Sequence, residues 1–255
     1  MSRIDEIWPD AELDLDDDAL LRRLEPPQRP WLRMNFITSL DGAATRDGRS
    51  GGLGDDADRR MFDLLRQWAD VVLLGAGTAR IEGYGAMRVG DAAAAWRAAR
   101  GMPPHPVLAL VTRRLDLDPS SPIFVDAPRR PIVFTVASAP AHRREELANV
   151  ATVLDAGADE VDPRLVRRIL AEQGLTRIHS EGGPRLFGSF LDGGAVDELC
   201  LTLAATLESG ESGRIAHGPH AVAQQMRLAS VLRAGDELLL RYTTTRAQTT
   251  RTESS

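Results

Sequence analysis

The sequence predicts an α/β protein of three layers, α/β/α, with a mostly parallel sheet and an antiparallel strand at one edge. From Trp31 onward, short apolar runs alternate with stretches of helical spacing, which is typical of a sheet with helices on both faces. The runs are continuously apolar, as in VVLLG, and strands buried on both faces have this pattern. The 255 residues, 43% of them hydrophobic, suffice for one large or two small globular domains.

Local signals predict each element in turn. The helix after Val161 has Asp162 at its cap, Pro163 in its first turn and Gly174 just beyond its end, so its limits are well marked. The last strand, ELLLRYTT, is expected to be the antiparallel edge strand. The expected strands are 31–37, 70–75, 106–112, 130–136, 150–154, 176–180, 197–204 and 237–244, and the expected helices are 56–68, 91–100, 142–149, 162–173 and 184–191.

The two ends of the chain differ in composition from its middle. Residues 1–28 form an acidic arm punctuated by proline, which we expect to pack loosely, with one short helix across DDDALLRRL. Residues 246–255 are polar and without periodicity, so we expect a disordered tail. With no repeat or linker between them, residues 29–245 are expected to form a single domain.

Charge and composition narrow the function classes. The net charge of −6 and a pI near 5.4 do not suggest a nucleic-acid partner. No apolar run approaches the length of a membrane span, and the N-terminus lacks a signal-peptide pattern, so we expect a cytoplasmic protein. All 31 basic residues are arginines, so any fixed cation at a site must be a guanidinium.

The sequence does not predict a metal site. Cys200 is the single cysteine and lies in an apolar run, which excludes an intramolecular disulfide and a cysteine zinc site. The histidines at 105, 142, 179, 217 and 220 include no HxxxH pair, and the last two flank a Gly-Pro turn. We therefore expect no metal and assign His179 no role.

Chemistry in such a sheet is expected beyond the carboxyl ends of the strands, where ligands bind in open α/β folds. One strand runs into Ser39 and Asp41, followed by a glycine-rich loop, although an ordinary turn explains this stretch equally well. Another strand opens into Gly75, Gly77 and Thr78. A Gly-x-Gly turn also allows a helix to pack closely on a strand, so by itself it is weak evidence for a nucleotide site.

A third strand ends in Thr112, Arg113 and Arg114. A hydroxyl beside two guanidinium groups is suited to a ribose 2′-phosphate, while a solvated turn is the alternative reading.

The fourth strand end reads HSEGGPRLFGSFL. Glu181 ends the strand, Gly182 and Gly183 allow a close approach of the backbone to a ligand, and Pro184 starts a helix whose free amides can hold a pyrophosphate. Four such ends in one sheet indicate a binding cleft, and the residues alone support a nucleotide-binding α/β enzyme.

Three stretches carry a resemblance to a known family. NFITSLDGAAT, ADVVLLGAGTARIEGYG and IHSEGGPRLFGSFLDGGAVDELCLTLA resemble, in order and spacing, the reductase domain of the riboflavin pathway, which has a dihydrofolate reductase-like fold. The chain looks most like the stand-alone actinobacterial pyrimidine reductase subgroup. The similarity spans about residues 31–243.

The resemblance implies an NADPH-dependent reductase that transfers hydride to C1′ of the ribosylamino group of 5-amino-6-(5-phosphoribosylamino)uracil, a small heterocyclic substrate. It also implies a homodimer. Carried over by position, the catalytic residues would be Glu181, Asp41 and Glu82, and the substrate residues Asn35, Ser39, Ser50, Arg66 and Arg88. The cofactor residues would be Gly75, Gly77, Thr78, Thr112, Arg113, Arg114, Gly182, Gly183, Arg185 and Leu186.

Three departures from the family fall on the substrate side. Ala43 stands where lysine is usual, Glu82-Gly83-Tyr84 replaces Asp-Asp-Pro, and SGGLGD lacks the usual tryptophan and threonine. Two alternatives therefore stay open: a reductase of dihydrofolate or another pterin, and a non-catalytic NADPH-binding regulatory protein.

Overall fold

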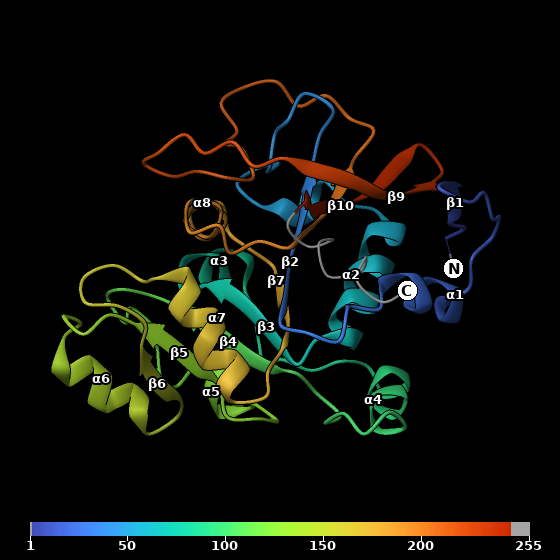
Figure 1. Cartoon of the computed structure of the whole chain (residues 1–255). Coiled ribbons are helices and arrows are strands. Elements are labelled where there is room, and N and C mark those ends of the chain that lie inside the picture. The colour runs from blue at the N-terminus through green and yellow to red at the C-terminus, as the bar shows by residue number, and fades with distance from the viewer. Residues whose placement is uncertain (1, 246–255) are drawn as a thin grey trace, which may run out of the picture.

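The structure is a computed structural model, which describes residues 2–245. Over those residues the chain builds one ten-stranded sheet in the order β1-β9-β10-β8-β2-β7-β3-β4-β5-β6, with helices on both sides of it (Figure 1). Each neighbouring pair from β8 to β6 is parallel, whereas β1, β9, β10 and β8 pair antiparallel. The predicted α/β class and the mostly parallel sheet are confirmed.

The elements have the following bounds. The strands are β1 (Asp5–Trp8), β2 (Trp31–Thr38), β3 (Val71–Gly75), β4 (Val107–Val111), β5 (Ile132–Thr135), β6 (Thr152–Asp155), β7 (Arg177–Ser180), β8 (Glu198–Leu203), β9 (Met226–Ala234) and β10 (Glu237–Thr244). The helices are α1 (Asp17–Leu24), α2 (Asp56–Trp68), α3 (Ala76–Glu82), α4 (Asp91–Ala98), α5 (Pro122–Val125), α6 (Ala141–Ala148), α7 (Pro163–Glu172) and α8 (Pro184–Asp192), and a 3₁₀ turn, η1, covers Ser50–Gly52.

Two features of the sheet differ from expectation. β10 was expected at an edge, but it lies between β9 and β8, and the edge on that side is β1. β1 and β9 were not predicted. β1 has only four residues, and it forms by pairing with β9, while β9 forms by pairing with β10. The local sequence of a strand does not reveal such long-range pairing.

Apolar side chains on each face of the sheet explain the layers. On one face, Val166 and Leu170 of α7 and Phe187 and Phe190 of α8 pack over Leu73 and its neighbours. The opposite face is covered by α3, α5 and α6, and α2 lies beside β7 on this side, where the rings of Phe62 and His179 meet edge to face. The central strands are thus buried on both faces, as their continuous apolar runs predicted.

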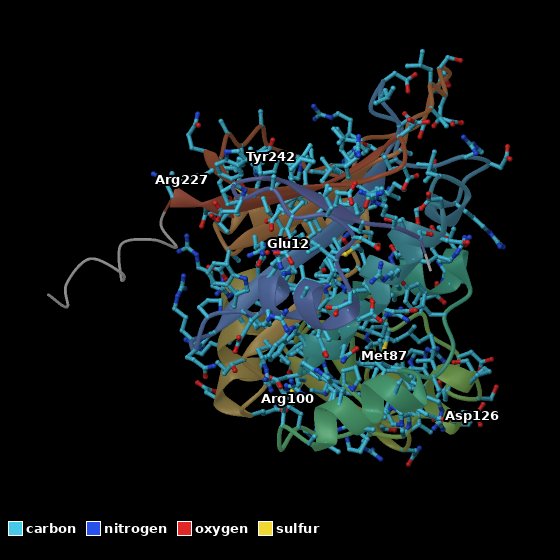
Figure 2. All side chains as sticks on the ribbon, turned by 90° about the vertical axis from the view of Figure 1, so that its right-hand side faces the viewer. Glu12, Met87, Arg100, Asp126, Arg227 and Tyr242 are labelled. Atoms are coloured by element: carbon cyan, nitrogen blue, oxygen red, sulfur yellow. The ribbon has the colours of Figure 1, made fainter. Side chains whose placement is uncertain are left out.

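The N-terminal segment packs more closely than expected. The predicted short helix is α1, which Asp16 caps by accepting a hydrogen bond from the amide of Ala19 at 2.7 Å. Ile4 and Leu20 have no exposed surface, and they share a core cluster with Leu64 of α2 and Leu232 of β9. Figure 2 looks onto this segment, where Glu12 lies over the body of the molecule. The expected disordered tail, 246–255, lies outside the described residues.

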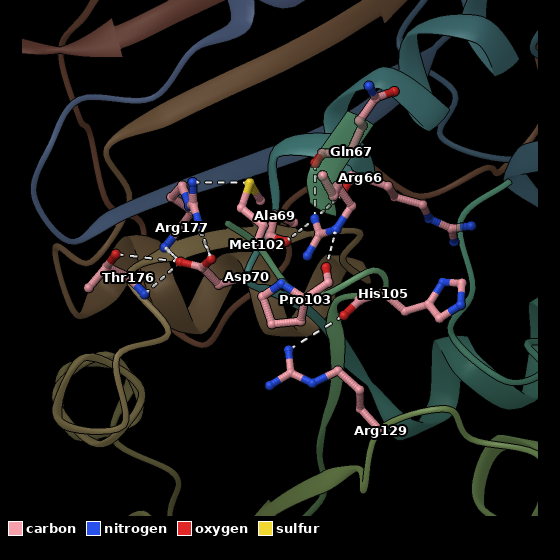
Figure 3. Close-up of polar contacts among 11 residues, drawn as sticks. Arg66, Gln67, Ala69, Asp70, Met102, Pro103, His105, Arg129, Thr176 and Arg177 are labelled. Atoms are coloured by element: carbon pink, nitrogen blue, oxygen red, sulfur yellow. Dashed lines mark hydrogen bonds and ion pairs between the residues drawn. The ribbon is translucent and has the colours of Figure 1, made fainter. Parts of the chain in front are cut away.

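The C-terminal end of α2 is anchored by a buried arginine of α4. Arg97 donates hydrogen bonds to the carbonyl oxygens of Gln67 at 2.9 Å, Ala69 at 2.6 Å and Pro103 at 2.8 Å (Figure 3). Burial lowers its pKa to about 10, although the nearby Asp70 carboxylate opposes this. These bonds satisfy carbonyls that a helix end leaves without partners, and they fix the last turn of α2.

A second anchor joins the same region to β7. Asp70, just after α2, accepts from Nε of Arg177 at 3.0 Å and from the backbone amides of Arg177 and Thr176 at 2.9 and 3.1 Å (Figure 3). The end of α2 and the start of β7 are therefore held together. None of the helices within residues 2–245 has the length and apolar character required to span a bilayer.

The packing of the N-terminal segment generates a prediction. Leu20→Ala should lower the free energy of unfolding by roughly 2–5 kcal/mol, because it opens a cavity beside α2. Leu13→Ala, at a side chain that is 65% exposed, should change it by less than about 0.5 kcal/mol. Urea unfolding measures both variants; equal, small effects would show that the segment is as loose as its composition suggests.

Candidate active site

The four strand ends singled out in the sequence lie next to one another. β2, β7, β3 and β4 are consecutive neighbours in the sheet and all parallel, so their carboxyl ends form one edge. A cavity of about 500 Å³ opens at this edge. Its walls come from the ends of β2 and β7, one face of α2, η1 and the segment from α3 to Met87.

A buried carboxylate lies at the centre of this cavity wall. Glu181 is 7% exposed and accepts two hydrogen bonds from Arg66, from Nε to Oε1 at 2.5 Å and from Nη2 to Oε2 at 2.8 Å. The hydroxyl of Tyr84 donates to Oε2 at 2.7 Å. Glu181, Arg66 and Tyr84 all line the cavity, and we call them the Glu181 cluster.

The electrostatics of the Glu181 cluster keep its carboxylate ionised. Burial alone would raise the pKa of Glu181, but the Arg66 guanidinium and its hydrogen bonds outweigh burial, and the pKa lies below its ordinary value. Burial and the adjacent Glu181 raise the pKa of Tyr84, which therefore stays a hydroxyl. His179, with Nε2 3.5 Å from Glu181, has a pKa lowered by burial to about 4, so its ring is neutral.

Helical spacing and one glycine bring the cluster together. On α2, Asp58, Phe62 and Arg66 follow one another at four-residue intervals and so share the face toward the cavity. Gly83 ends α3 in the left-handed region at φ +75°, which turns Tyr84 back so that its amide donates to the carbonyl of Ala79 at 2.9 Å. The guanidinium of Arg66 then lies 4.2 Å from the ring of Phe62 and 5.8 Å from that of Tyr84.

The glycines after β7 form a cradle that has no room for side chains. Gly182 has φ +87°, and its carbonyl accepts from the amide of Gly75 at 2.8 Å. A Cβ on Gly182 would lie 2.7 Å from the ring of Phe36, and one on Gly183 would lie 2.4 Å from Oγ1 of Thr78. Gly183 is the N-cap of α8, whose first amides face this edge with Pro184 in the first turn.

This cradle suits a dinucleotide. Bare backbone beside a helix N-terminus allows the close approach that a pyrophosphate needs. Thr78 and Gly183 line the cavity itself, whereas Gly75 lies just behind them. Gly77 is exposed on α3. This helix was not predicted, because Gly75 and Gly77 lie at its start and glycine disfavours helices.

A second carboxylate organises the rim. Oε1 of Glu82 accepts from the amide of Ser50 at 2.9 Å and from its hydroxyl at 3.0 Å, and both residues line the cavity. Glu82 thereby fastens η1 to the end of α3. Asn35, on β2, lines the cavity as well.

Asp58 was missed in the sequence. It lines the cavity from α2, and its Oδ1 accepts from the hydroxyl of Thr202 on β8 at 2.7 Å. Burial raises its pKa, partly opposed by that hydrogen bond. Asp58 lies one turn before Phe62 and two turns before Arg66, so helical spacing alone could have placed it on the same face of the helix.

Several predicted site residues lie away from the cavity. Ser39, 1% exposed, donates to Asp41, which also accepts from the amides of Glu208 at 3.1 Å and Ser209 at 2.7 Å. These bonds, that from Ser39 first, lower the pKa of Asp41 to about 2. Asp41 thus ties the loop after β2 to the loop after β8 and does not line the cavity, and its catalytic role stays a prediction.

The expected phosphate arginines are also arranged differently. Arg66 lines the cavity and donates to both oxygens of Glu181 through Nε and Nη2. Arg88 is exposed, donates to the carbonyl of Asp126 at 2.7 Å and does not line the cavity. Within residues 2–245, the arginines that line the cavity are Arg66 and Arg59.

The remaining cofactor candidates lie along the same sheet edge or on α8. Thr112 follows β4, and its Oγ1 accepts from the amide of Leu115 at 3.1 Å. Arg113 pairs with Glu160 at the surface, and Arg114 is exposed. On α8, Arg185 is exposed, whereas Leu186 is 8% exposed and belongs to the core. In the described part of the chain, no group of three or more His, Cys, Asp or Glu side chains could hold a metal ion.

The fold and the site define an α/β protein with a glycine cradle and a buried carboxylate at adjacent strand ends. The family model of the RibD C-terminal domain matches residues 30–240. The chain belongs to the RibD C-terminal domain family, and the resemblance seen in the sequence is confirmed.

Individual relatives agree with this assignment. A 2,5-diamino-6-ribosylamino-4(3H)-pyrimidinone 5′-phosphate reductase of Methanothermobacter thermautotrophicus is 31% identical over 224 residues, which cover 84% of this chain and 98% of that protein. The riboflavin biosynthesis protein RibD of Bacillus amyloliquefaciens is 27% identical over 194 residues, covering 71% of this chain and 50% of that protein.

Solved structures show the same fold. A pyrimidine reductase-like protein of Corynebacterium diphtheriae has a TM-score of 0.78 and 29% identity, covering 84% of this chain and 92% of that one. The yeast riboflavin biosynthesis reductase Rib7 has a TM-score of 0.63 at 16% identity, covering 88% of this chain and 97% of that one. The expected dihydrofolate reductase-like fold is confirmed.

The glycine cradle generates a prediction. Gly182→Ala should lower the free energy of unfolding by about 2 kcal/mol or more, because a side chain there is strained at positive φ and meets Phe36. Gly90→Ala is the matched control: its φ is ordinary, and nothing lies within 4 Å of the added carbon. Chemical unfolding compares the two, and unchanged stability of Gly182→Ala would contradict the described cradle.

Proposed function

We propose that this chain is an NADPH-dependent reductase that transfers hydride to C1′ of the ribosylamino group of 5-amino-6-(5-phosphoribosylamino)uracil. The observation that carries the proposal is the Glu181 cluster, an ionised carboxylate facing a cavity beside a glycine cradle. The name of the 31% identical archaeal relative supports the substrate class, because it specifies a ribosylamino pyrimidine 5′-phosphate.

NADPH would be held along the sheet edge. Thr78 and the backbone of Gly182 and Gly183 would contact the nicotinamide and pyrophosphate, and the amides at the start of α8 would face the phosphates. Thr112 and Arg113, with Arg114, would bind the 2′-phosphate. The Arg113–Glu160 pair is solvent-exposed, with side chains 55% and 76% accessible, so a phosphate can replace Glu160 at little cost. When bound, NADPH supplies a hydride to an electrophilic carbon.

Two neighbouring residues of α2 would position the substrate. Asp58 has one oxygen bonded to Thr202, and its second oxygen can accept from ring or amino N–H groups of the heterocycle. Arg59 would bind the 5′-phosphate. Its recorded partner is Asp56 at 2.7 Å, in a pair whose side chains are 65% and 81% accessible, so this guanidinium is easily released.

The spacing on α2 supports this orientation. Arg59 and Arg66 are seven residues apart, so about 10 Å of helix separates the phosphate end from the Glu181 cluster. A substrate whose C1′ lies at Glu181 would run its heterocycle and its sugar chain side by side along α2, the heterocycle toward Asp58 and the phosphate toward Arg59. The acidic neighbours Asp56 and Asp58 weaken the attraction for phosphate, and Asp58 does so less because its pKa is raised by burial.

Glu181 would act through its charge. Opening of the ribose ring leaves positive charge on the C1′–N bond, and an ionised carboxylate beside it lowers the energy of that state. Arg66 and Tyr84 keep Glu181 ionised and in place, and the neutral ring of His179 adds no further positive charge beside it. The contribution of the chain is therefore positioning and electrostatics.

Reduction of dihydrofolate or another pterin is the second candidate. Two departures from the family, the glycine-rich segment at 50–54 and Tyr84, contribute lining residues to the cavity, where they could admit a different heterocycle. Asp58 suits a pterin as well as a pyrimidine.

Parallel assays of NADPH oxidation test the function. One reaction contains the aminopyrimidine ribosyl phosphate made in situ by a separate deaminase, and the other contains dihydrofolate; NADH replaces NADPH in a matched pair. Fast oxidation of NADPH in the first supports the proposal, and oxidation only in the second supports the pterin. Tight NADPH binding without turnover on either heterocycle would identify a regulatory protein.

Glu181→Gln should reduce turnover by on the order of 100-fold, because the charge opposite the reacting carbon is lost. The NADPH dissociation constant should stay within a few-fold, since Glu181 faces the substrate. Steady-state kinetics and fluorescence titration measure the two quantities. If NADPH binding falls as much as turnover, Glu181 belongs to the cofactor site or the fold has been damaged.

Arg59→Ala should lower kcat/KM for the phosphorylated substrate by roughly 10- to 100-fold, because a charge-assisted contact to phosphate is lost. It should leave kcat/KM for the dephosphorylated substrate unchanged. Arg80→Ala removes a comparably exposed arginine of the Arg80–Asp116 pair outside the cavity and serves as the control. Equal losses with both substrates would contradict a phosphate contact.

A further inference from the structure

We infer that Tyr84 is a positioning residue that fixes Glu181 in its ionised, cavity-facing state. The catalytic part of this inference rests on the proposed function, and the structural part does not. Tyr84 stands where the riboflavin enzymes usually have proline, so the contact would be a feature of this chain that those enzymes lack.

Glu181 is surrounded by hydrogen-bond donors from two separate elements. Arg66 of α2 reaches both oxygens, at 2.5 and 2.8 Å, and Tyr84 from the segment after α3 reaches Oε2 at 2.7 Å. Oε2 therefore accepts two hydrogen bonds and Oε1 accepts one. Without Tyr84 the carboxylate would be held by α2 alone.

The other titratable groups near the pair come from α2, α3 and β7. Asp63 of α2 and Glu82 of α3 add negative charge near Glu181 and Tyr84 respectively, and His179 of β7 is neutral. Arg66 is the cation that opposes them. The hydroxyl of Tyr84 assists Arg66 without adding charge of its own.

Tyr84 is suited to donate a hydrogen bond rather than a proton. Loss of its proton would put a second anion 2.7 Å from Glu181 inside a buried site, and burial together with Glu181 accordingly raises the pKa of Tyr84 above its ordinary value. A group that cannot ionise near neutral pH holds its donor direction throughout the reaction.

The surrounding packing fixes the direction of that hydroxyl. Gly83 turns the chain at the end of α3, Tyr84 packs against the core cluster of α3 and β3, and Met87, 4% exposed, anchors the segment beyond it. The phenol ring thus reaches Glu181 from the segment after α3, whereas Arg66 reaches it from α2.

The first test needs no substrate. The chain has two tyrosines, so Tyr242→Phe leaves Tyr84 as the single phenol, and Tyr84→Phe leaves Tyr242, which lies on β10 outside the cavity. Alkaline titration of tyrosinate absorbance should show Tyr84 un-ionised well above pH 10, and Glu181→Gln in the same background should shift its titration downward. Circular dichroism at each pH records that the fold persists. Ordinary titration of Tyr84 would overturn the inference.

The second test separates positioning from simple packing. In Tyr84→Phe the acid limb of the pH profile of kcat/KM should move upward by roughly 0.5–1 pH unit, because Glu181 loses a donor to its charged form. kcat should fall by roughly tenfold, while the KM for NADPH stays constant. An unshifted profile in an active Tyr84→Phe would overturn the positioning role and leave the proposed reaction intact. If Tyr84 titrates well above pH 10 and no heterocycle is turned over, the structural part of the inference stands and the proposed reaction is overturned.

Discussion

The buried ion pair between Glu181 and Arg66 is the interaction on which the site depends. It joins the end of β7 to the last turns of α2 through two residues that lie 115 positions apart in the chain. Charges buried this deeply are tolerated only when their hydrogen bonds are satisfied. Arg66 meets Glu181 on both oxygens and Tyr84 completes the set, so the charge is kept in a cavity wall where burial alone would neutralise it.

Much of the surrounding structure serves to hold α2 against β7. Arg97 binds the carbonyls at the end of the helix, and the Asp70–Arg177 pair joins the following residue to the start of β7. On the outer side, α1 and the hairpin of β9 and β10 share a core with α2. The acidic N-terminal segment is therefore part of the support for the site, because it buttresses the helix that carries Asp58 and Arg66.

The predictable part of the fold is the part with strong local signals. The limits of α2 and α7 and the central strands follow from caps and continuous apolar runs, whereas β1, β9 and α3 depend on pairing or on glycines that permit a helix. At the site, the position of strand ends and the family resemblance predicted Glu181 and the neighbouring Gly182 and Gly183. They missed Tyr84 as a site residue, because its hydrogen bond joins residues 97 positions apart. They also missed Asp58, although its four-residue spacing from Phe62 and Arg66 places all three on one face of a helix. The roles that they assign to Asp41 and Arg88 stay predictions, and both side chains contact segments outside the cavity.

In the proposed reaction, hydride reaches a ribosylamino carbon beside Glu181. This step is measured most directly with NADPH deuterated at both C4 positions and the aminopyrimidine ribosyl phosphate, followed by mass spectrometry and NMR of the product. We expect one deuterium, located at C1′ of a ribityl chain. Deuterium elsewhere in the product, or an undeuterated product, would contradict it.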